Sequence, residues 1–165
     1  EKTSAECPDG GKHGYQLAVL IISRMTSGGW FAGWFSSVDS EAKQFATEIG
    51  EAWGVGDQGC NNGIVLFLSI YDRYAYIKTT DMTQKVLTDS LGGLVIDNMK
   101  PLLKDRRYDE AVLQGVLQIY DVLMGQKIPG QFWQQFRNIV FIIAIGIFLL
   151  LFFAGPTCFV CSVLM

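Results

Sequence analysis

The charge-free C-terminal end most constrains what this chain can fold into. All 13 Lys and Arg residues and all 16 Asp and Glu residues lie at or before Arg137. From Ile139 to Phe153 every residue is apolar or glycine. A helix rises about 1.5 Å per residue, so roughly 20 residues cross a hydrocarbon core of about 30 Å. The sequence therefore predicts a transmembrane helix over residues 136–158, with residues 159–165 at the far membrane boundary.

A buried core helix is the alternative interpretation of this segment. A helix that is apolar on every side needs a protein interior around it, and a chain of 165 residues offers too small an interior. We therefore favour the lipid bilayer as its surroundings. The remaining sequence divides into an N-terminal arm (1–14), one domain with its own core (15–124) and a linker (125–135).

The start of the chain and its charge suggest a compartment and exclude one class of partner. The chain opens at Glu1 without a methionine or an apolar leader, which favours a signal peptide already removed and a domain outside the cell. We expect a plasma-membrane protein with a cytoplasmic C-terminus. A net charge of −3 without a basic run argues against nucleic acid as a partner.

Periodicity along the domain predicts an α/β fold. Strands are expected where short apolar or alternating runs occur, and helices where apolar residues recur at steps of three and four. The predicted strands are 15–25, 64–70 and 74–80, and the predicted helices are 38–53, 89–104 and 108–124. The first two strands should be buried on both faces. The helix over 108–124 should bury Val112, Val116, Ile119, Tyr120 and Leu123. The first two strands should be parallel through a right-handed crossover, and the second and third should form a hairpin. The arm should be a loop.

Several short motifs in this order resemble the TPM domain family. They are Trp53-Gly54-Val55-Gly56, Asn62-Gly63 before an apolar strand, Asp72-Arg73, Leu87-Thr88-Asp89 and Tyr108-Asp109. The family is named for a thylakoid lumen protein, a photosystem II repair protein and a nematode modulator of levamisole-type acetylcholine receptors. The resemblance implies a TPM-type domain with a small mixed sheet flanked by helices. The added transmembrane helix makes the chain similar to the nematode branch.

That branch implies a non-catalytic auxiliary subunit that binds a ligand-gated ion channel, a levamisole-type acetylcholine receptor, and positively modulates it. Its partners would be the subunits of a pentameric ligand-gated channel in the same membrane, of the nicotinic type, at a synapse. We predict no cofactor. Two alternatives remain: an assembly or trafficking adaptor, and a membrane-tethered acid phosphohydrolase, since phosphatase activity has been proposed for plant members. The segment 79–83 lacks the Gly-rich run common in bacterial and plant members, which puts their ligand site in doubt here.

The four cysteines form two pairs with different expected roles. Cys7 and Cys60 each precede one of the parallel strands, so both should lie at the same edge of the sheet, where an oxidising compartment favours a disulfide over two free thiols. Cys158 and Cys161 fall at the end of the predicted span. They are either a palmitoylated pair or two small apolar residues of the helix. Gly146 and Gly155 would allow another helix to approach closely in lipid.

An aromatic surface is the predicted partner-binding site. The loop after the first strand carries Trp30, Phe31, Trp34 and Phe35, and the turn after the second strand carries Tyr71, Arg73 and Tyr74. Both leave parallel strands at the same edge of the sheet. Trp, Tyr and Arg contribute most to binding where they are exposed together. The alternative is a lid in which two or three of these aromatic side chains fold back on the core.

Catalytic and metal sites have little support in the sequence. His13 is the single histidine, it lies in the arm, and neither Gly-x-Ser-x-Gly nor HExxH occurs. Asp57, Asp72, Asp81 and Asp89 lie near strand ends and are weak candidates for a Ca²⁺ or Mg²⁺ site, because hard cations prefer carboxylate oxygens. Such residues are more often turn formers and helix caps. We predict no catalytic residues and no bound metal.

Overall fold

The computed structural model describes residues 4–8, 10–25, 38–132, 136 and 139–150. The chain divides into two compact units, residues 1–128 and 129–165, which are described separately below. The first unit holds the α/β domain that the sequence predicts, and it contains every strand of the described chain.

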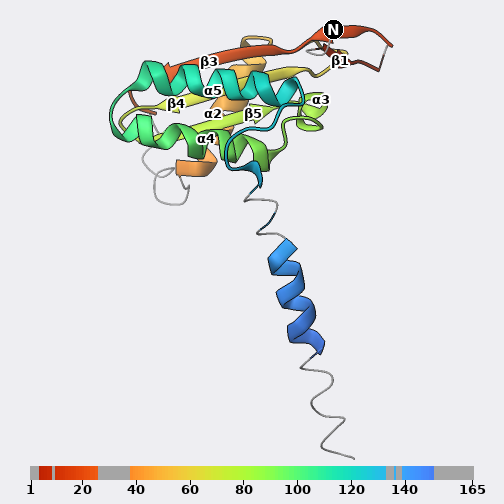
Figure 1. Ribbon diagram of the computed structural model, residues 1–165. Coiled ribbons are helices and arrows are strands. Elements are labelled where there is room, and N and C mark those ends of the chain that lie inside the picture. Colours follow the sequence, from red (N-terminus) through yellow and green to blue (C-terminus); the bar gives the residue numbers. More distant parts are fainter. Residues whose placement is uncertain (1–3, 9, 26–37, 133–135, 137–138, 151–165) are drawn as a thin grey trace, which may run out of the picture. The chain divides into compact units, whose positions relative to one another are not determined.

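A mixed three-stranded sheet forms the centre of the domain (Figure 1). Its strands are β3 (Gln16–Ile22), β4 (Gly63–Ser69) and β5 (Tyr74–Thr79), in the order β3-β4-β5. β3 pairs in parallel with β4, and β4 pairs with β5 as an antiparallel hairpin, which confirms both predicted pairings. Every residue of β4 is buried. β3 was expected to be buried on both faces, but it is an end strand, and Val19 and Ile21 on it are exposed.

Helices cover both faces of this sheet (Figure 1). On one face, α2 (Val38–Ala52) places Ala42 and Ala46 against Phe67 of β4. On the other face lie α4 (Asp89–Lys104) and α5 (Tyr108–Leu123), which bury Val95, Met99 and Ile119 with Ile64 and Leu66 of β4. The sheet alternates its side chains between the faces, so one strand serves two cores.

Helix ends follow the local chemistry that the sequence indicates. The Thr88 hydroxyl accepts a hydrogen bond from the backbone N–H of Leu91 at 3.4 Å and so caps α4. Arg106, with φ +60°, lies in the break between α4 and α5.

Two details of the helices differ from the sequence predictions. A short helix that the sequence did not predict, α3 (Asp81–Gln84), follows β5. Tyr120 was expected in the core, but it is 50% exposed on α5.

The N-terminal arm is ordered structure rather than the loop we expected. β1 (Ser4–Glu6) and β2 (Lys12–Gly14) form an antiparallel hairpin with Ala5 opposite His13. Ala5 is buried beside the cysteines Cys7 and Cys60, and Tyr15 packs on the same cluster. Burial raises the pKa of Tyr15 above its ordinary value. The hairpin belongs to the domain because its buried residues join a core cluster.

The second unit contains a helix over residues 139–150 in which every residue is exposed. Within the part of the chain that the structure describes, no helix is both long and apolar enough to cross a membrane. Residues 151–158 of the predicted span lie outside the described residues.

Candidate functional site

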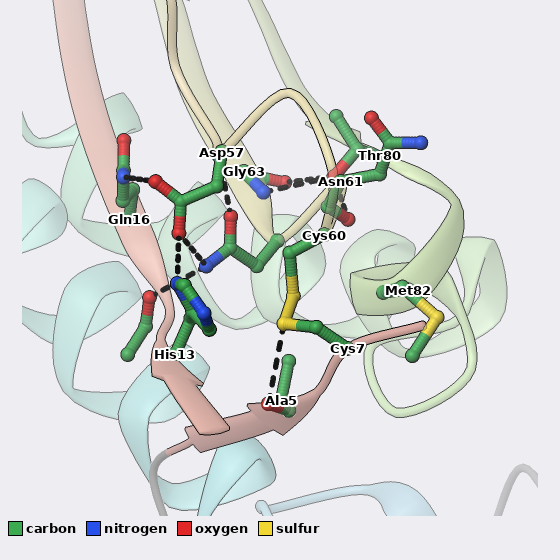
Figure 2. Close-up of a disulfide and its surroundings, with 12 residues drawn as sticks. Ala5, Cys7, His13, Gln16, Asp57, Cys60, Asn61, Gly63, Thr80 and Met82 are labelled. Atoms are coloured by element: carbon green, nitrogen blue, oxygen red, sulfur yellow. Dashed lines mark hydrogen bonds and ion pairs between the residues drawn. A yellow bond between two sulfur atoms is a disulfide. The ribbon is translucent and has the colours of Figure 1, made fainter. Parts of the chain in front are cut away.

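The Cys7–Cys60 disulfide fixes the arm to the edge where β3 and β4 begin (Figure 2). The two Cα atoms are 4.7 Å apart and the cysteines are 53 residues apart in sequence. Cys60 is 2% exposed and Cys7 is 6% exposed. Cys7 follows β1, and Cys60 lies in the loop between α2 and β4. The predicted pairing is therefore present, and it links the arm covalently to the loop before β4.

Asp57 is the centre of a polar cluster beside this disulfide (Figure 2). Its Oδ2 lies 2.9 Å from Nδ1 of His13 and accepts from Nδ2 of Asn62 at 3.2 Å, while its Oδ1 accepts from Nε2 of Gln16 at 3.1 Å. Asn62 also donates to the carbonyl of Gly14 at 2.8 Å. His13 thus has a defined contact in the folded domain. No local sequence pattern indicates this contact, because the two residues lie 44 positions apart.

Thr80 fastens the start of β4 to the end of β5. Its hydroxyl accepts from the backbone N–H of Gly63 at 2.8 Å and lies 2.5 Å from the carbonyl oxygen of Asn61. Asn61 adopts a left-handed backbone with φ +50°. The amide of Met82 also donates to the Asn61 carbonyl, at 3.1 Å. The hydroxyl is therefore committed to the backbone and is not placed as a nucleophile.

A cleft of about 350 Å³ opens along the same loop. It lies between the C-terminal end of α2 and the edge of the sheet, and its polar lining residues are Thr47, Glu51, Asp57, Gln58, Asn61, Lys78 and Thr80. Lys78 pairs with Val65 in the β4–β5 register and is half-buried. The cleft combines a lysine with carboxylates, so it can hold a small polar group. It forms no arrangement of nucleophile and base.

A second polar cluster lies at the opposite edge, where β3 and β4 end. Oδ2 of Asp72 accepts from the Ser69 hydroxyl at 2.5 Å and from the backbone N–H of Met25 at 2.7 Å. These two hydrogen bonds, with the nearby Arg24 charge, hold the pKa of Asp72 below its ordinary value. The Arg24 guanidinium carbon lies 5.6 Å from the ring centroid of Tyr71. Asp72 thus ties the end of β3 to the β4–β5 turn.

Replacing Asp72 with asparagine should make stability less dependent on acid pH. Folding lowers the pKa of this carboxyl, so at acid pH the unfolded chain binds more protons than the folded domain. The stabilisation that the ionised Asp72 gives the folded domain is therefore complete above about pH 4, the ordinary pKa of an aspartate, and is lost as pH falls through the folded-state pKa. We expect the difference in unfolding temperature between wild type and Asp72→Asn to shrink from pH 6 towards pH 3. Asp97→Asn, in an exposed i,i+3 pair with Lys100, is the control. A difference that stays constant with pH would refute the assignment.

Part of the predicted partner-binding site can be located in the structure. Tyr71 is 68% exposed and Arg73 is exposed, with φ +53°. Tyr74 is half-buried and packs against the Ala42, Ala46 and Phe67 cluster, so it contributes mainly to the core. Sequence reasoning missed Arg24, which extends the exposed group. The other residues of this prediction lie outside the described residues: Trp30, Phe31, Trp34 and Phe35.

The predictions for the second unit fall largely outside the described residues. Cys158, Cys161 and Gly155 belong to that part of the chain. Gly146 lies in the helix over 139–150, and a Cβ added there would meet no atom within 4 Å. The surface at Gly146 is therefore open to another helix, and a close helix contact there stays a prediction.

The four candidate acidic ligands do not converge. Asp57 and Asp81 lie near the edge where β4 begins, whereas Asp72 lies at the opposite edge. Asp89 opens α4 and accepts from Nε2 of Gln84 at 3.2 Å. Among residues 4–8, 10–25, 38–132, 136 and 139–150, no three His, Cys, Asp or Glu residues are grouped to hold a metal ion.

These features define an α/β domain with a polar cluster and a disulfide where β3 and β4 begin, and a second polar cluster where these strands end. A family model described as TPM domain matches residues 10–122. The chain belongs to the TPM domain family. The match begins within the hairpin that carries His13 and ends within α5, so it covers the sheet, the flanking helices and both polar clusters.

A solved structure shares this fold. The solution NMR structure of the N-terminal domain of a protein from P. gingivalis superposes with a TM-score of 0.55 and 24% sequence identity. The match covers 67% of this chain and 64% of that one, so this chain spans somewhat less than two thirds of its relative. At this identity the likeness concerns the fold alone. No curated protein matches the chain.

Proposed function

We propose that the chain is a membrane-anchored auxiliary subunit whose TPM domain binds a channel in the same membrane. The observation that carries the proposal is the helix over 139–150, in which every side chain is exposed. Ile142 is 68% exposed, Phe148 66% and Leu150 71%. Such a continuous apolar surface is costly in water, at about 25 cal/mol per Å². A bilayer removes that cost, and the apolar sequence continues to Phe153.

The anchor can be tested by placing charges within the apolar stretch. A carboxylate near the bilayer centre costs about 2.5–3.5 kcal/mol, so the double variant Ile143→Asp and Phe148→Asp should leave the membrane pellet after carbonate washing, while wild type stays. Leu113→Asp and Leu117→Asp, on an exposed face of α5, provide a matched control with the same added charge. Wild type that washes off, or a double variant that remains, would contradict the anchor.

The partner class rests on the family resemblance. The proposed partner is a pentameric ligand-gated channel of the nicotinic type in the plasma membrane of a synapse. The anchor would hold the TPM domain on the extracellular side of that membrane, beside the extracellular part of the channel. An auxiliary subunit changes gating only if it binds open or primed states better than resting ones. The exposed Tyr71, Arg73 and Arg24 group would be one contact. Co-purification with channel subunits in mild detergent is the first test, and absence of any channel subunit would count against the proposal.

An assembly factor would co-purify with the channel as well. It would raise the number of receptors at the surface without changing their response to agonist. Recording currents at matched surface levels separates the two roles, because only a modulator changes the response of each receptor.

The cleft beside Asp57 favours a phosphohydrolase as the second candidate, and the family model also carries phosphatase in its name. Lys78 could face a phosphate, and Glu51 or Asp57 could hold a divalent cation. Against this, the Asp57 carboxylate already has three side-chain contacts. Hydrolysis of a generic phosphomonoester that depends on added divalent metal, and is lost in Lys78→Met, would establish the activity.

A further inference from the structure

The outer edge of β3 is a backbone edge that the described sheet leaves open. β3 is the end strand of the order β3-β4-β5, and no strand within the described residues pairs with its other side. Its sequence, QLAVLII, contains no charged residue and no proline. Charged side chains, lysine above all, and proline are residues with which natural proteins protect exposed edges. With respect to the described part of the chain, the strand therefore presents main-chain hydrogen-bonding groups on its outer side that no other strand pairs with, and its sequence lacks the charged residues and proline that would oppose pairing.

The side chains of β3 show which face of this edge is apolar. Leu20 and Ile22 pack towards α2, whereas Leu17 packs into the core under α4 and α5. Val19 and Ile21 have the same parity as Leu17, so they point to the face that carries α5. Val19 is nevertheless 38% exposed and Ile21 46% exposed. α5 thus leaves the outer part of β3 uncovered.

α5 presents three different flanks. Gly115 and Gln118 face α4: a Cβ on Gly115 would lie 2.5 Å from Sδ of Met99, and Gln118 accepts from Nδ2 of Asn98 at 2.9 Å. Val112, Val116 and Ile119 join the core beneath the helix. At 100° per residue, the flank opposite α4 carries Leu113, Leu117 and Tyr120.

These three side chains are 59%, 53% and 50% exposed, respectively. Figure 1 shows that α4 lies on the β5 side and α5 on the β3 side of the same face. The flank opposite α4 therefore points along the sheet, above the open edge of β3. We call the resulting surface the β3 ledge, made of Val19, Ile21, Leu113, Leu117 and Tyr120.

The chemistry of the β3 ledge selects its occupant. The main-chain N–H and C=O groups along an open strand edge can form hydrogen bonds with an extended segment of another chain. A strand added there would place alternate side chains against Leu113, Leu117 and Tyr120. Acidic residues stand at both ends of the helical flank, Asp109 in the first turn of α5 and Asp121 near its last turn. An occupant with basic residues at its ends would complement them.

A second copy of the chain fits less well. Two β3 strands paired antiparallel around a two-fold axis would run the two α5 helices in opposite directions. Asp109 of one copy would then lie near Asp121 of the other. This like-charge arrangement is unfavourable, whereas a separate basic and apolar segment avoids it.

We propose that the β3 ledge binds an extended segment of a partner protein, with apolar residues at alternate positions and basic residues at its ends, as a fourth strand of the sheet. The proposal rests on the folded domain alone and does not require the membrane anchor or the channel. It specifies the kind of segment that an auxiliary subunit of this fold would recognise.

A synthetic strand peptide tests the proposal on the full chain in non-ionic detergent. The labelled probe alternates valine or isoleucine with threonine over six residues and carries two lysines at each end. Binding is followed by fluorescence anisotropy, with empty micelles as the blank. We expect saturable binding, and weakening of at least about tenfold in Ile21→Lys and in Leu117→Lys. Trp53→Lys, at an exposed residue just beyond α2, should bind like wild type.

Two further probes separate strand addition from adhesion to an apolar surface. A peptide N-methylated at alternate residues cannot donate along one edge and should lose binding. A peptide with glutamates in place of the lysines should bind more weakly, and added salt should reduce this difference. All variants are checked for wild-type thermal unfolding first, and the two charged substitutions lie on separate elements, so failure of one to fold leaves the other.

Several results would overturn the proposal. They are absence of binding up to about 1 mM peptide, binding that neither Ile21→Lys nor Leu117→Lys weakens, and equal binding of the N-methylated or glutamate-ended peptide. A dimer in sedimentation that Ile21→Lys abolishes would instead assign the β3 ledge to a second copy. None of these outcomes bears on the anchor, which carbonate washing tests separately.

Discussion

Replacing Gly63 with alanine is expected to destabilise the domain by about 3 kcal/mol or more. Gly63 opens β4 directly opposite the Gly54-Val55-Gly56 turn. A Cβ there would lie 2.8 Å from the carbonyl carbon of Val55, and closer still to its oxygen. Both groups are backbone, so neither can turn away as a side chain would. The turn must move, and with it the loop that carries Asp57 and Cys60.

The matched control is Gly93→Ala within α4. A Cβ on Gly93 would meet no atom within 4 Å, and alanine in a helix interior is favoured over glycine by about 0.5–1 kcal/mol. Adding one methyl group should therefore destabilise the domain at Gly63 and stabilise it at Gly93. Chemical denaturation of both variants measures this, and similar effects at the two sites would contradict the packing described for the turn.

Removing the Cys7–Cys60 disulfide is expected to cost about 2–4 kcal/mol. The bond closes a loop between residues 53 positions apart, and both cysteines are buried with Ala5. The double variant Cys7→Ala and Cys60→Ala should unfold at lower denaturant, with the arm becoming sensitive to proteolysis. Single substitutions are less informative because they leave a free thiol.

Reductant provides the internal control for this prediction. It should lower the stability of wild type to nearly that of the double variant and leave the variant unchanged. Alkylation without reductant should label wild type at no more than the two C-terminal cysteines, Cys158 and Cys161. Labelling of Cys7 or Cys60 in the folded protein, or a double variant as stable as wild type, would contradict the bond.

Local sequence patterns were sufficient for most of the fold. The apolar run of β4 and the hairpin into β5 need only nearby residues, and Thr88 marks the start of α4 by its own side chain. The crossover rule then gives the parallel pairing of β3 and β4. The hairpin of the arm was missed because its three-residue strands are held by a disulfide and a core cluster that lie elsewhere in the sequence.

The polar clusters were less accessible to sequence reasoning. The disulfide followed from topology, since both cysteines precede parallel strands. By contrast, the contact of His13 with Asp57 and the bond from Met25 to Asp72 join residues more than 40 positions apart. Tyr120 shows a second limit: its spacing fits the apolar face of α5, but the structure places it on the flank beyond the sheet. Helical period identifies a face, and neighbouring elements decide what covers it.

Agonist-evoked current measured at matched receptor surface levels tests the central claim most directly. Nicotinic-type receptors would be expressed with the full chain, with the double variant Ile143→Asp and Phe148→Asp, or alone, and currents normalised to surface label. The account predicts a larger response per receptor with the wild-type chain and no such increase with the variant. Equal normalised currents in all three cases, with the wild-type chain present at the membrane, would contradict a modulatory role.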